Sequence, residues 1–180
     1  MDDSSAVPDA ITFEQAIALT QALMADIELG NLSEDQIQST IASLVASENG
    51  ARGFFVTYLT DDRTLADSPS AAVVRALQSA PETVAELLVK NLAMSTAMAI
   101  AHRRSQNETI AQGSDRVQQR TVKLIDLIEL PEVNQKAQKL QQSAATGTGD
   151  YQAFLDRWGY DDEQRRQIMA VFQTVKSLHL

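Results

Sequence analysis

Residues 81–101 read PETVAELLVKNLAMSTAMAIA, and this stretch decides the expected fold. The proline at its start suits the first turn of a helix, and apolar residues then cover almost every side at helical spacing. A helix that is apolar all round has to be surrounded by other helices. Ala93, Ala97 and Ala101 recur every four residues, which allows close approach of neighbouring backbones. The stretch therefore predicts a buried central helix in an all-α protein.

The composition agrees with a single all-α domain over residues 1–180. Seven Gly and four Pro are few for a turn-rich sandwich or barrel, and 180 residues suffice for one core. We therefore expect a single-domain multi-helix bundle of about eight helices around the central apolar helix. Residues 1–11 are expected to form a flexible acidic N-terminus, and residues 144–149, AATGTG, a flexible linker before the last two helices.

Helix starts are marked by capping boxes, in which a small polar side chain precedes Gln by three residues. Gly30 then indicates the end of the first helix, and Asn49–Gly50 the end of the second. These two helices are expected to form an antiparallel hairpin. The three capping boxes are Thr12 with Gln15, Ser33 with Gln36, and Asp161 with Gln164.

Residues 52–60, RGFFVTYLT, have the composition of a strand, with aromatic and β-branched side chains. No second strand is predicted nearby, and a lone buried strand would leave its backbone groups unpaired. We therefore predict a short buried helix here, with an exposed loop at residues 61–68. Gly50 and Gly53 are predicted to form a turn between helices, because the Lys-Ser/Thr of a phosphate-binding loop is missing.

Turn and cap residues also divide the second half of the chain. A helix is expected from Ser68–Pro69 to about Ser79, and a turn near Gly113 before a helix that opens at Ser114. Pro131 then begins a more polar helix, which runs to about residue 143. Two short helices after the linker complete the expected fold.

The net charge of −9 is concentrated at one end of the chain. Residues 1–51 contain nine Asp and Glu and no Lys or Arg. Such a region repels nucleic acid and attracts basic partners. The structural alternative is a solvated acidic face that keeps the protein soluble. The acidic first residues and the lack of about 20 consecutive apolar residues predict neither a targeting nor a membrane-spanning segment.

The chain offers little for catalysis. It has no Cys, which excludes a thiol nucleophile, a disulfide and covalent haem or bilin attachment. Its two histidines, His102 and His179, are at a helix end and next to the last residue, and no Glu-x-x-His or Gly-x-Ser-x-Gly spacing occurs. We therefore predict no enzymatic activity, no catalytic residues, no metal and no cofactor.

A basic window is the most conspicuous candidate site. Residues 102–123 contain six basic or imidazole side chains and only two acids. A turn near Gly113 would place them on one exposed patch for a partner protein or an anion. The alternative is pairing with the protein's own acids. No aromatic side chains are interleaved with these basic residues, so the pattern does not favour nucleic-acid binding. The candidate residues are His102, Arg103, Arg104, Arg116, Arg120 and Lys123, of which Arg116 and Arg120 are expected to be exposed.

Two stretches carry a resemblance to a known group of proteins. They are residues 47–62, SENGARGFFVTYLTDD, and residues 87–104, LLVKNLAMSTAMAIAHRR. Together they resemble a family of small, acidic, helical proteins from cyanobacteria that have no assigned activity. The resemblance implies a photosynthetic bacterial cell, where soluble proteins attach peripherally to thylakoids or to pigment–protein assemblies.

Two functions remain open at this point. The first is a non-enzymatic interaction or assembly factor that uses charged helical surfaces to bind other proteins. The second is a helical module that holds a small apolar or anionic ligand between the central helix and residues 54–58. The expected location is cytoplasmic, with peripheral attachment to a thylakoid membrane as the open alternative, and the oligomeric state stays undetermined.

Overall fold

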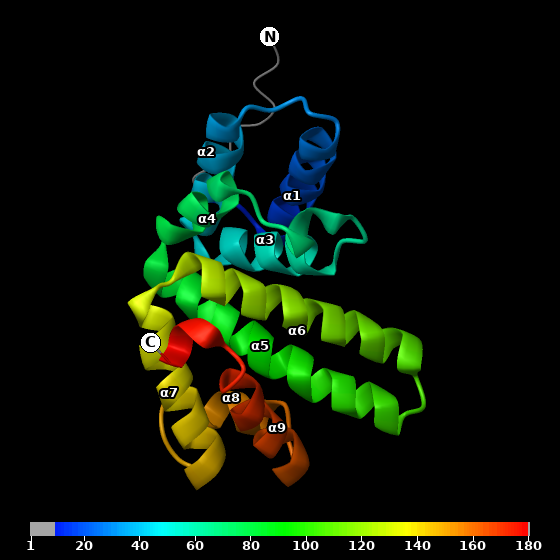
Figure 1. Cartoon of the computed structure of the whole chain (residues 1–180), viewed down its shortest axis with the longest axis vertical. Helices are drawn as coiled ribbons and strands as arrows, with labels where there is room; N and C mark the ends of the chain where they lie inside the picture. Colours follow the sequence, from blue (N-terminus) through cyan, green and yellow to red (C-terminus); the bar gives the residue numbers. More distant parts are fainter. Residues whose placement is uncertain (1–9, 180) are drawn as a thin grey trace. The chain divides into compact units, whose positions relative to one another are not determined.

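The computed structural model describes residues 10–179, which form nine α-helices and two short 3₁₀ helices and contain no strand (Figure 1). The predicted all-α fold is confirmed. The chain divides into two compact units, residues 1–87 (unit 1) and 88–180 (unit 2), so the boundary falls inside one helix, α5 (Pro81–Arg104). The expectation of a single domain stays a prediction.

Unit 1 begins with helices whose starts match the predicted capping boxes. The side chains of Thr12 and Ser33 each accept a hydrogen bond from the backbone amide of the Gln three residues later, and the side-chain oxygen of that Gln accepts one from the amide of the cap residue. Of the expected flexible segment 1–11, residues 1–9 lie outside the described residues, and Ile11 is buried. The elements of unit 1 before α5 are α1 (Phe13–Glu28), α2 (Glu34–Val45), α3 (Glu48–Thr60), η1 (Thr64–Asp67) and α4 (Ala71–Gln78).

Helix α3 confirms that residues 54–60 are helical and corrects the expected turn before them. Gly50 and Gly53 lie inside α3, which starts at the Ser47 cap. A Cβ on Gly53 would lie 2.4 Å from the Cβ of Ala16 and 3.0 Å from two backbone atoms of α1. These glycines therefore serve close helix packing, which local sequence does not distinguish from a turn.

The packing partners of α1 and α2 differ from the expected hairpin. Helix α1 packs mainly on α3, and α2 packs on α4 and α3. The aromatic side chains of α3 pack against one another: Phe54 stacks on Tyr58 with ring centroids 5.1 Å apart and meets Phe55 edge-on at 5.4 Å. All three are fully buried, so this part of the expected ligand site is occupied by the protein's own rings.

The expected loop at residues 61–68 is partly ordered as η1, whose Ala66 is buried. Helix α4 starts at Ala71 rather than at Pro69, because Ser70 caps it by accepting a hydrogen bond from the Val73 amide. The side chain that closes the first turn, and not the proline, sets this helix start.

Unit 2 is formed by the rest of α5 and the helices that follow. Leu88 and Leu92 of α5 are fully buried, which confirms this helix as core. Helix α7 starts at Pro131, as predicted. The further elements are α6 (Glu108–Ile128), α7 (Pro131–Thr146), α8 (Gln152–Arg157), α9 (Asp162–Phe172) and η2 (Lys176–His179).

Two expected breaks in unit 2 are placed differently. The turn between α5 and α6 occupies residues 105–107, with Asn107 as the cap of α6, and Gly113 lies inside that helix. Residues 144–146 of the expected linker belong to α7, which ends at the left-handed Gly147. The buried Ser143 hydroxyl accepts a hydrogen bond from the Tyr151 amide, so the short connection is tied back onto the helix it leaves.

A buried side-chain amide is one link between helix α9 and α5. The Oε1 atom of Gln164 accepts a hydrogen bond from the Asp161 amide and so completes the predicted capping box. Its Nε2 atom donates to the carbonyl of Ala97 at 3.0 Å. The start of α9 and its attachment to the central helix therefore depend on the same side chain.

Helix α5 is long and apolar enough to cross a membrane, judged by length and composition only. The sequence had predicted no such segment. No other helix of residues 10–179 meets this criterion. A core helix meets the same criterion, and 56% of the apolar stretch is buried inside the protein.

Candidate interaction surfaces

The six candidate residues of the basic window occupy two helices of unit 2. His102, Arg103 and Arg104 form the last turn of α5, where cations suit the helix dipole. Arg116, Arg120 and Lys123 follow along α6. The α5–α6 turn comes earlier than expected, before the Asn107 cap of α6.

Arg103 is enclosed by carboxylates of the next helix. Its guanidinium binds Glu108 at 3.1 Å and Asp115 at 2.5 Å, and these contacts raise its pKa further above the usual value. Both acids belong to α6. Arg103 thus links α5 to α6 across the turn that joins them.

Arg104 has equivalent partners on α9. It binds Asp161 at 2.5 Å and also pairs with Glu163. The hydrogen bonds from Arg104 hold the pKa of Asp161 below its ordinary value. All of these groups are exposed enough for water and salt to screen the ion pairs, so the pairs add little to the stability of the fold. The contacts therefore orient α9 more than they stabilise the fold.

The three basic residues of α6 are not equally accessible. Arg120 is only 3% exposed, Arg116 is half-buried and Lys123 is exposed. Arg116 and Arg120 were both expected to be exposed; this is wrong for Arg120 and only partly met by Arg116, because their spacing of four does not say which face of the helix is covered. All three residues interact with other parts of the protein. The window is therefore not one open cationic surface, and Arg103 and Arg104 follow the internal-pairing alternative.

The acidic excess, in contrast, coincides with unit 1. Residues 1–87 contain fourteen Asp and Glu and three Arg, whereas residues 88–180 contain ten acids and twelve Lys and Arg. Arg63 is held by Glu28 and Asp61, both at 2.9 Å. Four other carboxylates stand exposed in the first turns of α1, α2 and α3, namely Glu14, Glu34, Asp35 and Glu48.

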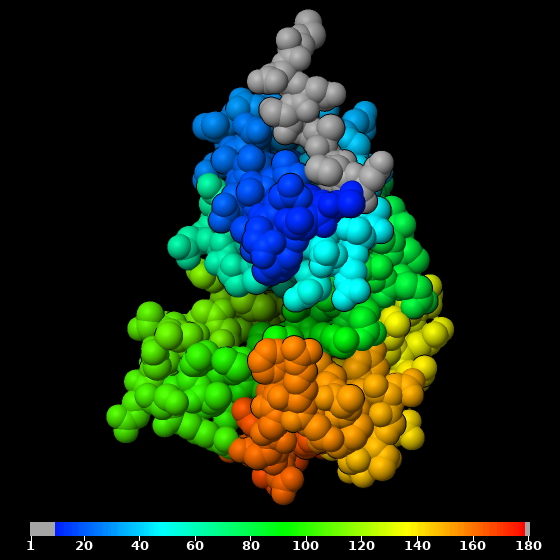
Figure 2. Space-filling model, turned by 180° about the vertical axis from the view of Figure 1, so that it is seen from behind, coloured from blue at the N-terminus to red at the C-terminus, as the bar shows by residue number. Residues whose placement is uncertain are grey.

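A second surface feature was missed in the sequence. Trp158, at the end of α8, is 49% exposed, and the guanidinium carbon of Arg157 lies 5.8 Å from the centroid of its ring. This segment belongs to the orange surface seen in Figure 2. The adjacent Arg and Trp were the available signal, since both residue types concentrate at binding sites.

Tyr160, next to this feature, buries a hydroxyl that has no hydrogen-bond partner among the described residues. Burial raises its pKa to about 12. Tyr160→Phe removes the unpaired hydroxyl, so its free energy of unfolding at pH 7, measured in urea, should equal or exceed that of the wild type. Tyr58→Phe is the control that should lose stability, because the Tyr58 hydroxyl donates to the Leu65 carbonyl.

The raised pKa also predicts a difference at high pH. An unfolded tyrosine titrates near pH 10. Because the folded pKa is higher, the native state holds the phenol proton more tightly, and this contribution is present below pH 10 and lost as the pH rises to about 12. Wild type should therefore lose more stability than Tyr160→Phe across that window. Parallel losses in the two proteins would contradict the assignment.

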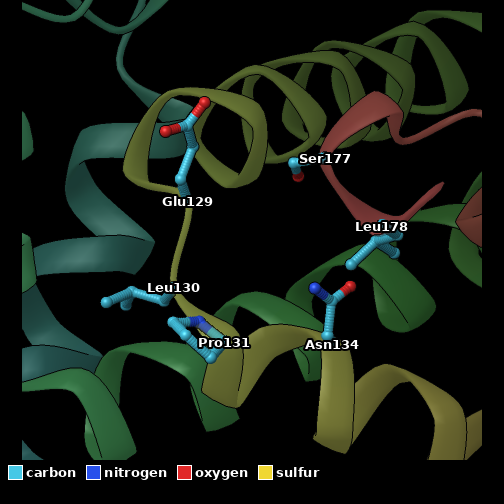
Figure 3. A pocket seen from close by; sticks show the side chains of 6 residues that line it. All are labelled: Glu129, Leu130, Pro131, Asn134, Ser177 and Leu178. Carbon is cyan, nitrogen blue, oxygen red and sulfur yellow. The ribbon is translucent and has the colours of Figure 1, made fainter. Parts of the chain in front are cut away.

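One hollow of about 270 Å³ opens between the α6–α7 corner and η2 (Figure 3). Glu129 caps α6 there in the left-handed conformation, at φ 51°. The Ser177 amide donates to Asp126, which fixes one wall. No group of three or more metal-ligating side chains occurs in the described part of the chain. The hollow is lined by Glu129, Leu130, Pro131, Asn134, Ser177 and Leu178.

Comparison with known proteins identifies one relationship. The family model described as "Uncharacterised conserved protein UCP020893" matches residues 12–175. The chain belongs to this family. The match runs from the cap of α1 to just before η2 and so spans all nine α-helices of the described residues. No curated protein and no solved structure matches the chain.

Proposed function

We propose that this protein is a non-enzymatic interaction or assembly factor that binds a basic partner protein through the exposed carboxylates of unit 1. The observation that carries the proposal is the charge imbalance of that unit, fourteen acids against three bases. Carboxylates of one sign on one surface steer a basic partner and select its orientation.

The competing explanation is that these acids only stabilise helix starts. Glu14, Glu34 and Glu48 do lie in first turns, where an acid contributes about 0.3–1 kcal/mol. That effect requires acids near the helix starts and gives no reason for the absence of every Lys and Arg through residue 51. Recognition of a basic partner supplies that reason, because an interspersed base would weaken the attraction.

An apolar side chain accompanies the acids. Leu29, which caps the end of α1, is 72% exposed and is followed by the α2 acids Glu34 and Asp35. Association surfaces combine apolar contacts with a polar rim. The α1–α2 connection is therefore the part of unit 1 that we assign to partner binding. The assignment replaces the basic window as the main surface, since Arg103 and Arg104 are already paired.

The setting of this activity follows from the resemblance to cyanobacterial proteins. We place the factor in the cytoplasm, in peripheral contact with thylakoid-bound or other photosynthetic assemblies. The negative charge disfavours nucleic acid. The alternative of a ligand held beside residues 54–58 gains no support, because those rings are packed against one another.

The test removes carboxylates from the assigned surface. Glu34→Gln with Asp35→Asn should weaken capture of the partner from native lysate at low salt by about 1 kcal/mol, a factor of roughly five. Raising the ionic strength to about 0.15 M, where the Debye length is about 8 Å, should weaken capture by the wild type. Bound protein is quantified by mass spectrometry.

The matched control removes two exposed carboxylates from unit 2, by Glu129→Gln with Asp162→Asn. It has the same net charge as the test variant and should capture the partner as the wild type does. Equal loss in both variants would show that net charge alone matters. Undiminished capture by the test variant, or no partner at low salt, would end the proposal.

A further inference from the structure

The end of α8 and its cap present an exposed pair of adjacent side chains, Arg157 and Trp158. Trp158 leaves about half of its surface in water, and Arg157 lies over its ring, which restricts both side chains. Restricting side chains in advance lowers the entropy lost on binding. Trp and Arg are also the residue types that most often dominate binding energy.

The charge of Arg157 is not taken up by the nearest acid in sequence. Asp156 accepts hydrogen bonds from Arg165, at 3.0 Å, and from Gln152, at 2.6 Å. Elsewhere in unit 2, Arg103 and Arg104 are each bound by two carboxylates. The guanidinium carbon of Arg157 instead lies 5.8 Å from the centroid of the Trp158 ring, and a guanidinium placed over a ring still presents N–H donors at its edge.

The complementary chemistry occurs on the same chain, in unit 1. The exposed indole of Trp158 calls for an apolar contact, and the guanidinium of Arg157 calls for carboxylates. Leu29 is the most exposed large apolar side chain of the described residues, and Glu34 and Asp35 follow it at the start of α2. No Lys or Arg lies within the first 51 residues.

We propose that the Arg157–Trp158 pair of one molecule docks on the α1–α2 connection of a second copy of the same chain, with Trp158 against Leu29 and Arg157 between Glu34 and Asp35. This goes beyond binding of a basic partner, because it gives unit 2 a binding role and makes the second copy an occupant of the acidic surface.

The contact joins two different surfaces, so it is head-to-tail. A docked pair of molecules leaves one surface of each kind unused, so further copies can add unless the arrangement closes into a ring. One aromatic anchor and one charged cluster make a small interface of the weak, transient class. The self-association should therefore appear only at high protein concentration and should fall with salt.

Sedimentation velocity over a wide range of protein concentration tests this. At low salt the average mass should rise with concentration, and 0.5 M NaCl should reduce the rise. Trp158→Ala and Arg157→Glu should each keep the protein monomeric over the same range. The matched control is Lys176→Glu, which makes the same charge change at an exposed position of η2 and should associate like the wild type.

A charge exchange makes the test specific. Arg157→Glu places acids on both surfaces, and Glu34→Lys with Asp35→Lys places bases on both, so neither variant should associate alone. An equimolar mixture should recover the mass increase, because every contact between unlike molecules again joins opposite charges. A monomeric wild type at all concentrations, or association that persists in Trp158→Ala, would overturn the proposal.

The outcome is separable from that for the basic partner. Arg157→Glu leaves the acidic surface unchanged and should still capture the partner from lysate. If the wild type self-associates, and Arg157→Glu does not but still captures the basic partner, both proposals are supported. If the wild type does not self-associate but captures the basic partner, only the self-association proposal is rejected.

Discussion

Truncation of Leu92 to Ala should lower the free energy of unfolding by about 2–5 kcal/mol, the largest loss that we expect from one substitution. The side chain lies on α5 with no exposed surface, as does Leu88 one turn earlier. Removing it sacrifices the burial of its methyl groups and leaves a cavity that close-packed neighbours fill only in part.

Urea unfolding followed by circular dichroism measures this loss. The matched control is Ile110→Ala, which truncates a side chain that is 50% exposed on α6 and should change stability by less than about 1 kcal/mol. Losses below about 1 kcal/mol at both Leu88 and Leu92 would contradict the assignment of α5 as core.

Gly53→Ala should destabilise the protein by about 3 kcal/mol, at the upper end of the cost of overpacking. The added Cβ would meet the Cβ of Ala16 at 2.4 Å, and it would lie 3.0 Å from the Phe13 carbonyl oxygen and from the Ile17 amide. Backbone atoms cannot rotate away, so α1 and α3 would have to separate.

Gly113→Ala is the matched substitution with the opposite expected sign. Gly113 lies inside α6, and a Cβ there would have no atom within 4 Å. The gain should be about 0.5–1 kcal/mol, because alanine loses less backbone entropy in a helix. If both alanine variants were equally stable, the close approach of α1 and α3 would not exist in solution.

The same glycines show where sequence reasoning reached its limit. A capping box is a local arrangement of four residues, so Thr12, Ser33 and Asp161 correctly marked helix starts. A glycine in a sequence fits a turn or a close helix contact equally well, and the choice depends on which distant helix lies opposite. Gly53 and Gly113 were both assigned to turns for that reason.

The candidate site was limited in the same way. The sequence located the acidic excess and the basic window, because charge is visible residue by residue. Neither the pairing of Arg104 with Asp161, 57 positions away, nor the burial of Arg120 could be derived from spacing along one helix. The Arg157–Trp158 pair is adjacent in sequence, but its importance depends on exposure, which only the fold determines.

Gln164 couples the start of helix α9 to the contact between α9 and α5. Its side chain closes the first turn of α9 and also donates a hydrogen bond to the Ala97 carbonyl of α5. If α9 moves away from α5, the side chain that caps α9 therefore loses its second hydrogen bond. Because one side chain makes both hydrogen bonds, we expect fraying of the first turn of α9 and loss of its link to α5 to occur together, as one local opening within unit 2. During folding the cap can form within a few residues, whereas its second hydrogen bond has to wait until a loop of 67 residues has closed.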